Sequence, residues 1–242
     1  MTDLAAVARR AIPLVDLTSL DEDDDTAVAE DLCARARTPA GPVAAVCLMP
    51  ALVALAADRL AGSGVRVATV ANFPAGAPDA GAAARETEAA VAAGAAEVDV
   101  VAPWRAWLAG DRAAVATLVA ACRAACGDRA RLKVILEAGS LPDPDAVRAI
   151  ATDAIAAGAQ FVKTSTGKVG QGATPDAARA MLEAVRDAGG TIGFKAAGGI
   201  RTTAQAAAYL ALADELLGPA WATPETFRLG ASSLLDDLLA RA

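Results

Sequence analysis

Three segments show the pattern from which the fold can be inferred: LKVILEAG at Leu132–Gly139, FVKTSTGKV at Phe161–Val169 and GFKAAGGIRT at Gly193–Thr202. Each of the three begins with a short run of mainly apolar residues and ends in small or polar ones. Between them lie the Ala-rich segments Asp145–Ala157 and Pro175–Ala188, whose lengths suit helices. Alternation of strands and helices is typical of a parallel sheet covered by helices.

The same alternation extends to both ends of the chain and gives eight strand–helix units. The strands are expected at Pro13–Leu17, Ala44–Leu48, Arg66–Val70, Glu97–Val101, Leu132–Leu136, Phe161–Thr164, Thr191–Lys195 and Phe227–Gly230. The helices are expected at Thr26–Arg37, Ala51–Ala61, Ala80–Ala93, Arg105–Cys126, Asp145–Ala157, Pro175–Ala188, Thr203–Leu216 and Ser233–Arg241. Thr174 before Pro175 is a helix-start signal.

Eight such units in 242 residues, with no linker-like break, predict an α/β protein with one domain over residues 1–242, a (β/α)8 TIM barrel. An open doubly wound sheet that binds a dinucleotide is disfavoured, because no GxGxxG follows the first strand.

Composition excludes several classes of function. The net charge of −7, without a Lys/Arg cluster, argues against a nucleic-acid partner. The absence of histidine removes His-dependent nucleophiles and most zinc chemistry, and the four cysteines form no CxxC. The acidic run Asp21–Asp25 is interpreted as a solvated helix start in preference to a metal site. Neither a metal nor a cofactor is therefore expected.

The uncharged run from Thr38 to Ala57 raises the question of a membrane span. Pro39, Pro42 and Pro50 interrupt it, so a buried strand followed by a helix is expected instead. No targeting segment is recognisable at the N-terminus, and the expected location is the cytoplasm with reduced thiols.

Lysine usage points to the chemistry. Only four of the 22 basic residues are lysines, and all four lie in or just after the fifth to seventh predicted strands: Lys133, Lys163, Lys168 and Lys195. An amine can lose its proton and attack a carbonyl, which a guanidinium cannot do. Burial and mutual repulsion are expected to lower the pKa of both Lys163 and Lys195. The pattern favours a Schiff-base lysine, and a buried ion pair or a phosphate ligand is the alternative.

A Schiff base also needs a group that removes a proton. Asp99, which has apolar neighbours in VDVV, is a candidate proton shuttle, and a structural counter-ion for a lysine is an equally good interpretation.

Two glycine–serine segments suggest a phosphate site. Gly198–Gly199 follows the seventh strand, and Gly230, Ser232 and Ser233 follow the eighth, each just before a helix. Backbone N–H groups at such positions bind anions, and barrel enzymes commonly hold phosphate there.

These segments resemble deoxyribose-phosphate aldolase, a family of class I aldolases. The matching segments run in family order over nearly the whole chain: VDLTSL, AAVCLMP, ATVANFPAG, GAAEVDVV, LKVILEAG, FVKTSTGKV, GFKAAGGIRT and RLGASSLL. The resemblance implies metal-free, reversible cleavage of 2-deoxy-D-ribose 5-phosphate to D-glyceraldehyde 3-phosphate and acetaldehyde. It also implies a barrel that commonly forms homodimers.

Matching motif positions give each residue an implied role. Lys163 would form the Schiff base, Lys195 would perturb it, and Asp99 would relay the proton. Residues implied near the sugar are Asp16, Thr18, Cys47, Lys133 and Thr166. Residues implied near the phosphate are Gly167, Lys168, Gly198, Gly199, Gly230, Ser232 and Ser233. For Cys47, packing inside the barrel is the favoured role.

One feature departs from the family pattern. Some members have a C-terminal tail ending in tyrosine, whereas the only tyrosine here, Tyr209, lies in a predicted helix. Three other functions stay open: a lysine-dependent aldolase with a different acceptor, a sugar-phosphate-binding barrel without catalysis, and a phosphosugar isomerase. The last is disfavoured by the absence of histidine.

Overall fold

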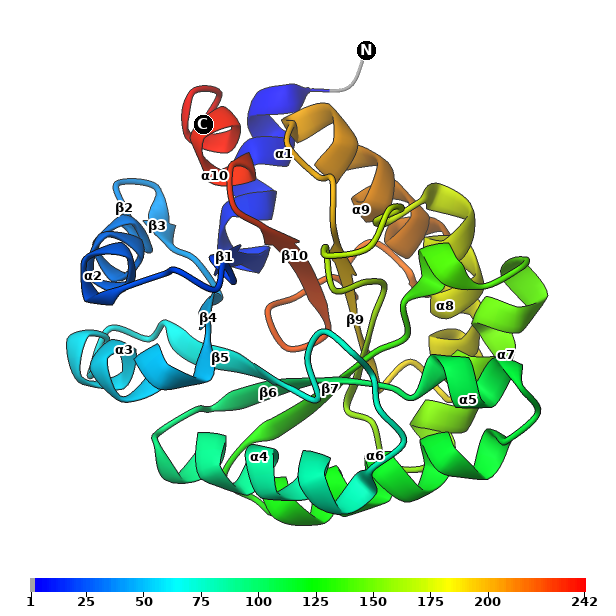
Figure 1. Cartoon of the computed structure of the whole chain (residues 1–242). Coiled ribbons are helices and arrows are strands. Elements are labelled where there is room, and N and C mark those ends of the chain that lie inside the picture. The colour runs from blue at the N-terminus through cyan, green and yellow to red at the C-terminus, as the bar shows by residue number, and fades with distance from the viewer. Residues whose placement is uncertain (1–2) are drawn as a thin grey trace.

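The computed structural model describes residues 3–242, in which eight parallel strands close into a barrel surrounded by helices (Figure 1). The strands are β1 Val15–Thr18, β4 Ala45–Leu48, β5 Arg66–Ala71, β6 Glu97–Val101, β7 Arg131–Ile135, β8 Phe161–Lys163, β9 Gly193–Ala197 and β10 Phe227–Ala231. Each pairs with the next strand of the barrel, and β1 pairs with β10 to close it. The predicted (β/α)8 barrel is confirmed.

The outer layer consists of helices, most of which begin after an Asp or Thr that caps them. They are α2 Thr26–Arg35, α3 Val53–Arg59, α4 Ala80–Ala92, α5 Trp104–Leu108, α6 Arg112–Cys126, α7 Pro144–Ala156, α8 Pro175–Asp187, α9 Thr203–Leu217 and α10 Leu234–Leu239. Asp25 ends the acidic run and caps α2 by accepting hydrogen bonds from two backbone N–H groups. Thr174 caps α8 as expected from the sequence.

The predicted helix Arg105–Cys126 is wrong as a single element. Gly110 adopts a left-handed φ of 99° after α5, and Asp111 then caps α6 by accepting a hydrogen bond from Ala114 N. A residue with that φ cannot continue a right-handed helix, so the segment divides at this glycine.

An N-terminal helix and a small hairpin were not predicted. Asp3 caps helix α1, Leu4–Ala11, which packs against α9 and α10 and leads through a short 3-10 turn, Ile12–Leu14, into β1. After α2, the segments β2 Arg37–Thr38 and β3 Gly41–Pro42 form a small antiparallel hairpin. No helix in the described part of the chain is long and apolar enough to cross a membrane.

The strand register aligns the basic residues inside the barrel. Lys163, Lys195 and Arg228 are Cα partners across β8, β9 and β10, and Asp99 is the partner of Lys133 across β6 and β7. The expectation that Lys195 ends its strand is wrong, because β9 continues to Ala197 and stops only at Gly198, where φ becomes 92°. Lys195 therefore lies deeper in the barrel than expected.

Other interior positions are filled by apolar residues. Ala45, Cys47, Ala68 and Val70 from β4 and β5 form a small cluster together with Leu20. Phe161 of β8 lies opposite Gly193, and a Cβ at position 193 would stand 2.3 Å from its ring carbons. A glycine is therefore required beside this ring.

Gly193→Ala should lower the free energy of unfolding by about 1–3 kcal/mol, since overpacking moves a buried ring or the backbone. Denaturant unfolding measures this as a lower midpoint at an unchanged slope. Gly170→Ala is the matched control, because a Cβ at position 170 would meet no atom within 4 Å beyond its chain neighbours. Equal stability of the two variants would contradict the proposed clash.

Candidate active site

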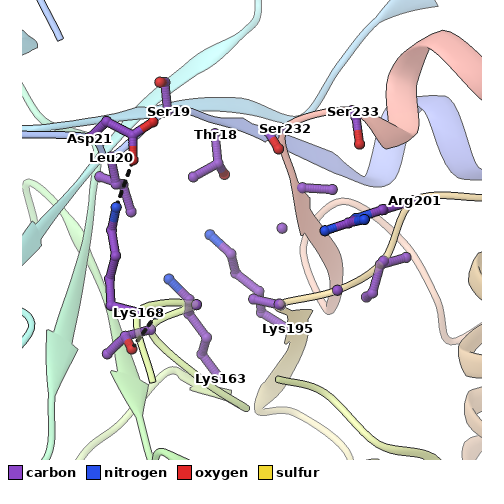
Figure 2. Close-up of a pocket in the computed structure, with 18 residues that line it drawn as sticks. Thr18, Ser19, Leu20, Asp21, Lys163, Lys168, Lys195, Arg201, Ser232 and Ser233 are labelled. Carbon is purple, nitrogen blue, oxygen red and sulfur yellow. Dashed lines mark hydrogen bonds and ion pairs between the residues drawn. The ribbon is translucent and has the colours of Figure 1, made fainter. Parts of the chain in front are cut away.

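A cavity of about 280 Å³ opens at the carboxyl end of the barrel (Figure 2). It is bounded by segments at the carboxyl ends of four neighbouring strands: Thr18–Asp21 at the end of β1, Thr166–Lys168 after β8, Ala197–Arg201 at the end of β9 and Gly230–Ser233 at the end of β10. The side chains of Lys163 and Lys195 reach it from below. This is the end at which barrel enzymes carry their active sites.

Most residues singled out from the sequence line this cavity. They are Thr18, Lys163, Thr166, Gly167, Lys168, Lys195, Gly198, Gly199, Gly230, Ser232 and Ser233. Asp16, Cys47, Asp99 and Lys133 do not line it, because their side chains are buried inside the barrel. The expected contact of these residues with a substrate stays a prediction. Asp16 adjoins the cavity through Lys195, which lies 2.6 Å away and borders it.

Below the cavity, six buried side chains form a closed ring of ion pairs, which we call the ionic ring. Cations and carboxylates alternate around it: Arg228–Asp16 2.6 Å, Asp16–Lys195 2.6 Å, Lys195–Asp99 2.8 Å, Asp99–Lys133 2.8 Å, Lys133–Glu97 2.5 Å and Glu97–Arg228 2.7 Å. All six side chains have an exposure of 0%. Each buried charge thus has at least two opposite charges as neighbours, and Lys133 also lies 3.5 Å from Asp16 across the ring.

Lys163 is attached to this ring from outside. Its Nζ lies 2.8 Å from Asp99 Oδ2, the same oxygen that Lys195 contacts, and it has no other carboxylate within ion-pair distance among the described residues. Its side chain is 3% exposed and borders the cavity. Lys163 is therefore the amine of the interior with the fewest compensating charges.

The pKa of Lys163 follows from this position. Burial lowers it, Asp99 raises it and the ammonium of Lys195 lowers it, and the net result lies below the ordinary lysine value. An amine with a lowered pKa has a larger neutral, nucleophilic fraction at neutral pH.

Lys195 differs from the expectation. Burial lowers the pKa of Lys195, but Asp16 and Asp99 outweigh burial and raise it above the ordinary value. Lys133 likewise has a raised pKa, because Asp99, Glu97 and Asp16 outweigh burial. The expectation of a lowered pKa for both Lys163 and Lys195 is therefore wrong for Lys195.

The buried carboxylates are held in the charged form. Burial raises the pKa of Asp99, but Lys133, Lys163 and Lys195 outweigh it and bring the pKa well below the usual range. By contrast, burial raises the pKa of the Cys47 thiol, so this side chain stays protonated among its charged neighbours.

The far wall of the cavity has the features of an anion site. Gly198 and Gly199 have φ values of 92° and 83°, and Ser232, Ser233 and Arg201 point toward the cavity (Figure 2). A Cβ on Gly198 would lie 2.8 Å from Ser165 Oγ and 2.9 Å from Gly172 Cα, so the loop is tightly packed here. Hydroxyls, a guanidinium and loop N–H groups together suit a phosphate group.

Lys168 spans the mouth of the cavity. Its Nζ lies 2.8 Å from Asp21 Oδ1, which joins the segment after β8 to the segment after β1 (Figure 2). Asp21 belongs to the acidic run, so one member of that run contributes to the cavity. Among the described residues, no three His, Cys, Asp or Glu side chains are grouped to hold a metal ion.

Four residues of this region received no role from the sequence: Glu97, Arg228, Arg201 and Glu137. Glu97 lies two positions before Asp99, and Arg228 two positions before Gly230, so alternation along a strand could have placed both inside the barrel. Arg201 comes two positions after the glycine pair, so its place in the chain could have indicated that it lies at the same wall of the cavity.

Glu137 sits at a left-handed φ of 52° and accepts a hydrogen bond of 2.7 Å from Thr166 Oγ1. Burial raises its pKa above the ordinary glutamate value. The hydroxyl of Thr166 is therefore committed to Glu137, although Thr166 lines the cavity.

Comparison with known proteins agrees with this architecture. The chain resembles a deoxyribose phosphate aldolase from Aeropyrum pernix, described as tetrameric, at 25% identity, over 98% of this chain and 96% of that chain, with a TM-score of 0.79. A protein from Coccidioides immitis, provisionally named a deoxyribose-phosphate aldolase, matches at 28% identity over 98% and 87%, with a TM-score of 0.81.

A Toxoplasma gondii protein with the same provisional name has the same fold, at 24% identity, over 98% of this chain and 96% of that chain, with a TM-score of 0.89. The sequence profile of the DeoC/LacD family aldolases matches residues 10–239, which is nearly the whole chain. Because this match covers nearly the whole chain, the protein belongs to the DeoC/LacD family of aldolases.

Proposed function

We propose that this aldolase cleaves 2-deoxy-D-ribose 5-phosphate reversibly to D-glyceraldehyde 3-phosphate and acetaldehyde, through a Schiff base on Lys163. The observation that carries this proposal is the position of Lys163: a buried amine with one shared carboxylate, a lowered pKa and access to the cavity. The name of the Aeropyrum pernix neighbour supports the choice of substrate.

In the cleavage direction, the neutral amine of Lys163 attacks C1 of the open-chain aldehyde, and loss of water gives an iminium. The electron pair of the C2–C3 bond moves toward the iminium nitrogen as the C3 hydroxyl loses its proton. D-Glyceraldehyde 3-phosphate leaves, and an enamine of acetaldehyde stays on Lys163. Protonation of the enamine at its carbon and hydrolysis release acetaldehyde and restore the amine.

Asp99 is the proposed proton-relay acid of this cycle. Its carboxylate contacts the amines of Lys133, Lys163 and Lys195, so it can orient the nucleophile and pass protons between amines. Its strongly lowered pKa makes it a weak base, which argues against direct removal of a carbon-bound proton by this carboxylate.

The proposed phosphate site is the wall formed by Gly198, Gly199, Ser232, Ser233 and Arg201. Lys163 borders the same cavity, so a short sugar phosphate can present its carbonyl to the amine while its phosphate lies at this wall. Lys168 is a second cation at the mouth, available to the phosphate when its pair with Asp21 opens. Binding energy at the phosphate then supports the chemistry at C1.

We also propose that the protein is cytoplasmic and assembles as a homodimer. The tetramer named for the Aeropyrum pernix neighbour shows that this fold supports assembly in at least one related protein.

Lys163→Arg should reduce turnover by about 10³-fold or more, because it keeps the charge and removes the amine that forms the covalent intermediate. Incubation with acetaldehyde and borohydride, followed by peptide mapping, should give an adduct on Lys163 in the unmutated protein and none at position 163 in the variant. An adduct that maps to Lys195, Lys133 or Lys168 would assign the nucleophile elsewhere. Aldol cleavage of a different sugar phosphate but not of the deoxyribose compound would refute the substrate.

Lys195→Leu should raise the pKa of Lys163 by about one to a few units, because it removes the neighbouring ammonium. Each unit corresponds to about 1.4 kcal/mol, or a tenfold smaller neutral fraction below the pKa. Trapping at Lys163 should become slower at neutral pH and recover as the pH rises. If the pH profile of trapping is the same in the variant and in the unmutated protein, Lys195 does not set the ionisation of Lys163.

Ser233→Asp should impair turnover of the phosphorylated sugar, since it places a like charge beside the proposed phosphate site. The ratio of kcat/KM for deoxyribose 5-phosphate to that for deoxyribose should fall about tenfold or more. Ser233→Asn is the matched control of similar size without the charge. An equal loss for both substrates would place the phosphate elsewhere.

A further inference from the structure

The ionic ring is balanced in charge. Lys133, Lys195 and Arg228 alternate with Asp16, Glu97 and Asp99, so three cations face three carboxylates. Lys163 lies outside the ring and is attached to Asp99, without a carboxylate of its own among the described residues. A net charge in a dry interior is costly, and an amine is the group that can remove it by losing a proton.

Charged and titratable groups face Lys163 from several elements. Asp99 and Lys195 lie on β6 and β9, the protonated Cys47 on β4 and Glu137 just after β7. Lys133 on β7 shares Asp99 with Lys163. Glu137 keeps its carboxylate on Thr166 and makes no ion pair with the described lysines. The charge balance around Lys163 is therefore governed by the ring.

Glu97 and Arg228 close the ring on the side away from the cavity. Arg228 donates to both oxygens of Glu97, to Asp16 Oδ1 at 2.6 Å and to the carbonyl of Pro224 at 2.6 Å. A guanidinium does not release its proton at any pH the fold survives, so this member contributes a permanent charge. Neither Glu97 nor Arg228 lines the cavity.

We propose that Glu97 and Arg228 are positioning residues: by closing a neutral ring of ion pairs, they leave Lys163 as the one interior amine whose charge has no partner of its own among the described residues. They act through Asp16, Lys133, Lys195 and Asp99 and do not touch the reacting atoms. The role of Glu97 and Arg228 in catalysis rests on the proposed function of Lys163. Their effect on the ionisation of Lys163 does not depend on that function.

Replacing Arg228 and replacing Glu97 should have opposite effects on the pKa of Lys163. Arg228→Gln leaves the ring one cation short, so Lys163 becomes the missing counter-ion and its pKa should rise. Glu97→Gln leaves the ring one carboxylate short, so a charged Lys163 is more costly and its pKa should fall. Shifts on the order of one pH unit are expected for charges at this depth.

The measurement is competitive labelling of Lys163 with a trace of acetic anhydride across pH, followed by peptide mapping. Only the neutral amine reacts, so the midpoint of the labelling profile reports the ionisation of Lys163 without requiring aldolase activity. The midpoint should move up in Arg228→Gln and down in Glu97→Gln. The pH profile of kcat/KM should move in the same directions.

The double variant Glu97→Gln/Arg228→Gln restores a balanced ring and should return the midpoint to within a few tenths of a unit of the unmutated protein. Arg66→Gln is the matched control, because Arg66 lies 3.6 Å from Glu97 but is 34% exposed and pairs with Glu225. It should leave the midpoint nearly unchanged. If Arg228→Gln fails to fold, two other variants still test the inference. Glu97→Gln should lower the labelling midpoint, and Arg228→Lys, which keeps the charge, should leave it unchanged.

Shifts in the same direction for both single variants, or no return in the double variant, would overturn the inference and leave these residues with a structural role. No acetaldehyde adduct on Lys163 in the unmutated protein would instead refute the proposed function. The labelling result would still stand in that case, because the anhydride reports on the amine alone.

Discussion

Charges buried inside the barrel are the constraint on which the other features depend. Moving a carboxylate or an ammonium from water into a protein interior costs several kcal/mol, and only close opposite charges offset that cost. The ionic ring meets this requirement with contacts of 2.5 to 2.8 Å and no exposed side chain. Because its members come from β1, β6, β7, β9 and β10, a shift of one residue in any of these strands would turn a charge out of the ring.

The remaining strands complete the surroundings of this ring. Small apolar residues on β4 and β5 and the ring of Phe161 on β8 fill the rest of the interior. They exclude water from the charges, which strengthens every ion pair and makes an unpaired charge more costly. Because water is excluded, the carboxylate of Asp99, which Lys163 shares with Lys195, does not keep the pKa of Lys163 at the ordinary lysine value.

The sequence predicted the barrel because alternation and glycine positions are local signals. It also predicted most of the cavity, since residues after parallel strands meet at one end. It could not predict the sign of the pKa shift of Lys195, which depends on Asp16 and Asp99, far away in the chain. For the same reason Glu97 and Arg228 received no role. The division at Gly110 was missed because a single glycine also occurs inside helices.

The zero exposure of the ionic ring separates it from the dissolved ions around the protein. Counter-ions screen charges that water reaches and leave buried pairs largely unaffected. The bridge between Lys168 and Asp21 is 34% and 71% exposed on its two sides, so it is open to screening. Ionic strength should therefore act on the mouth of the cavity, while the ionisation of the interior, including that of Lys163, stays the same in dilute and concentrated salt.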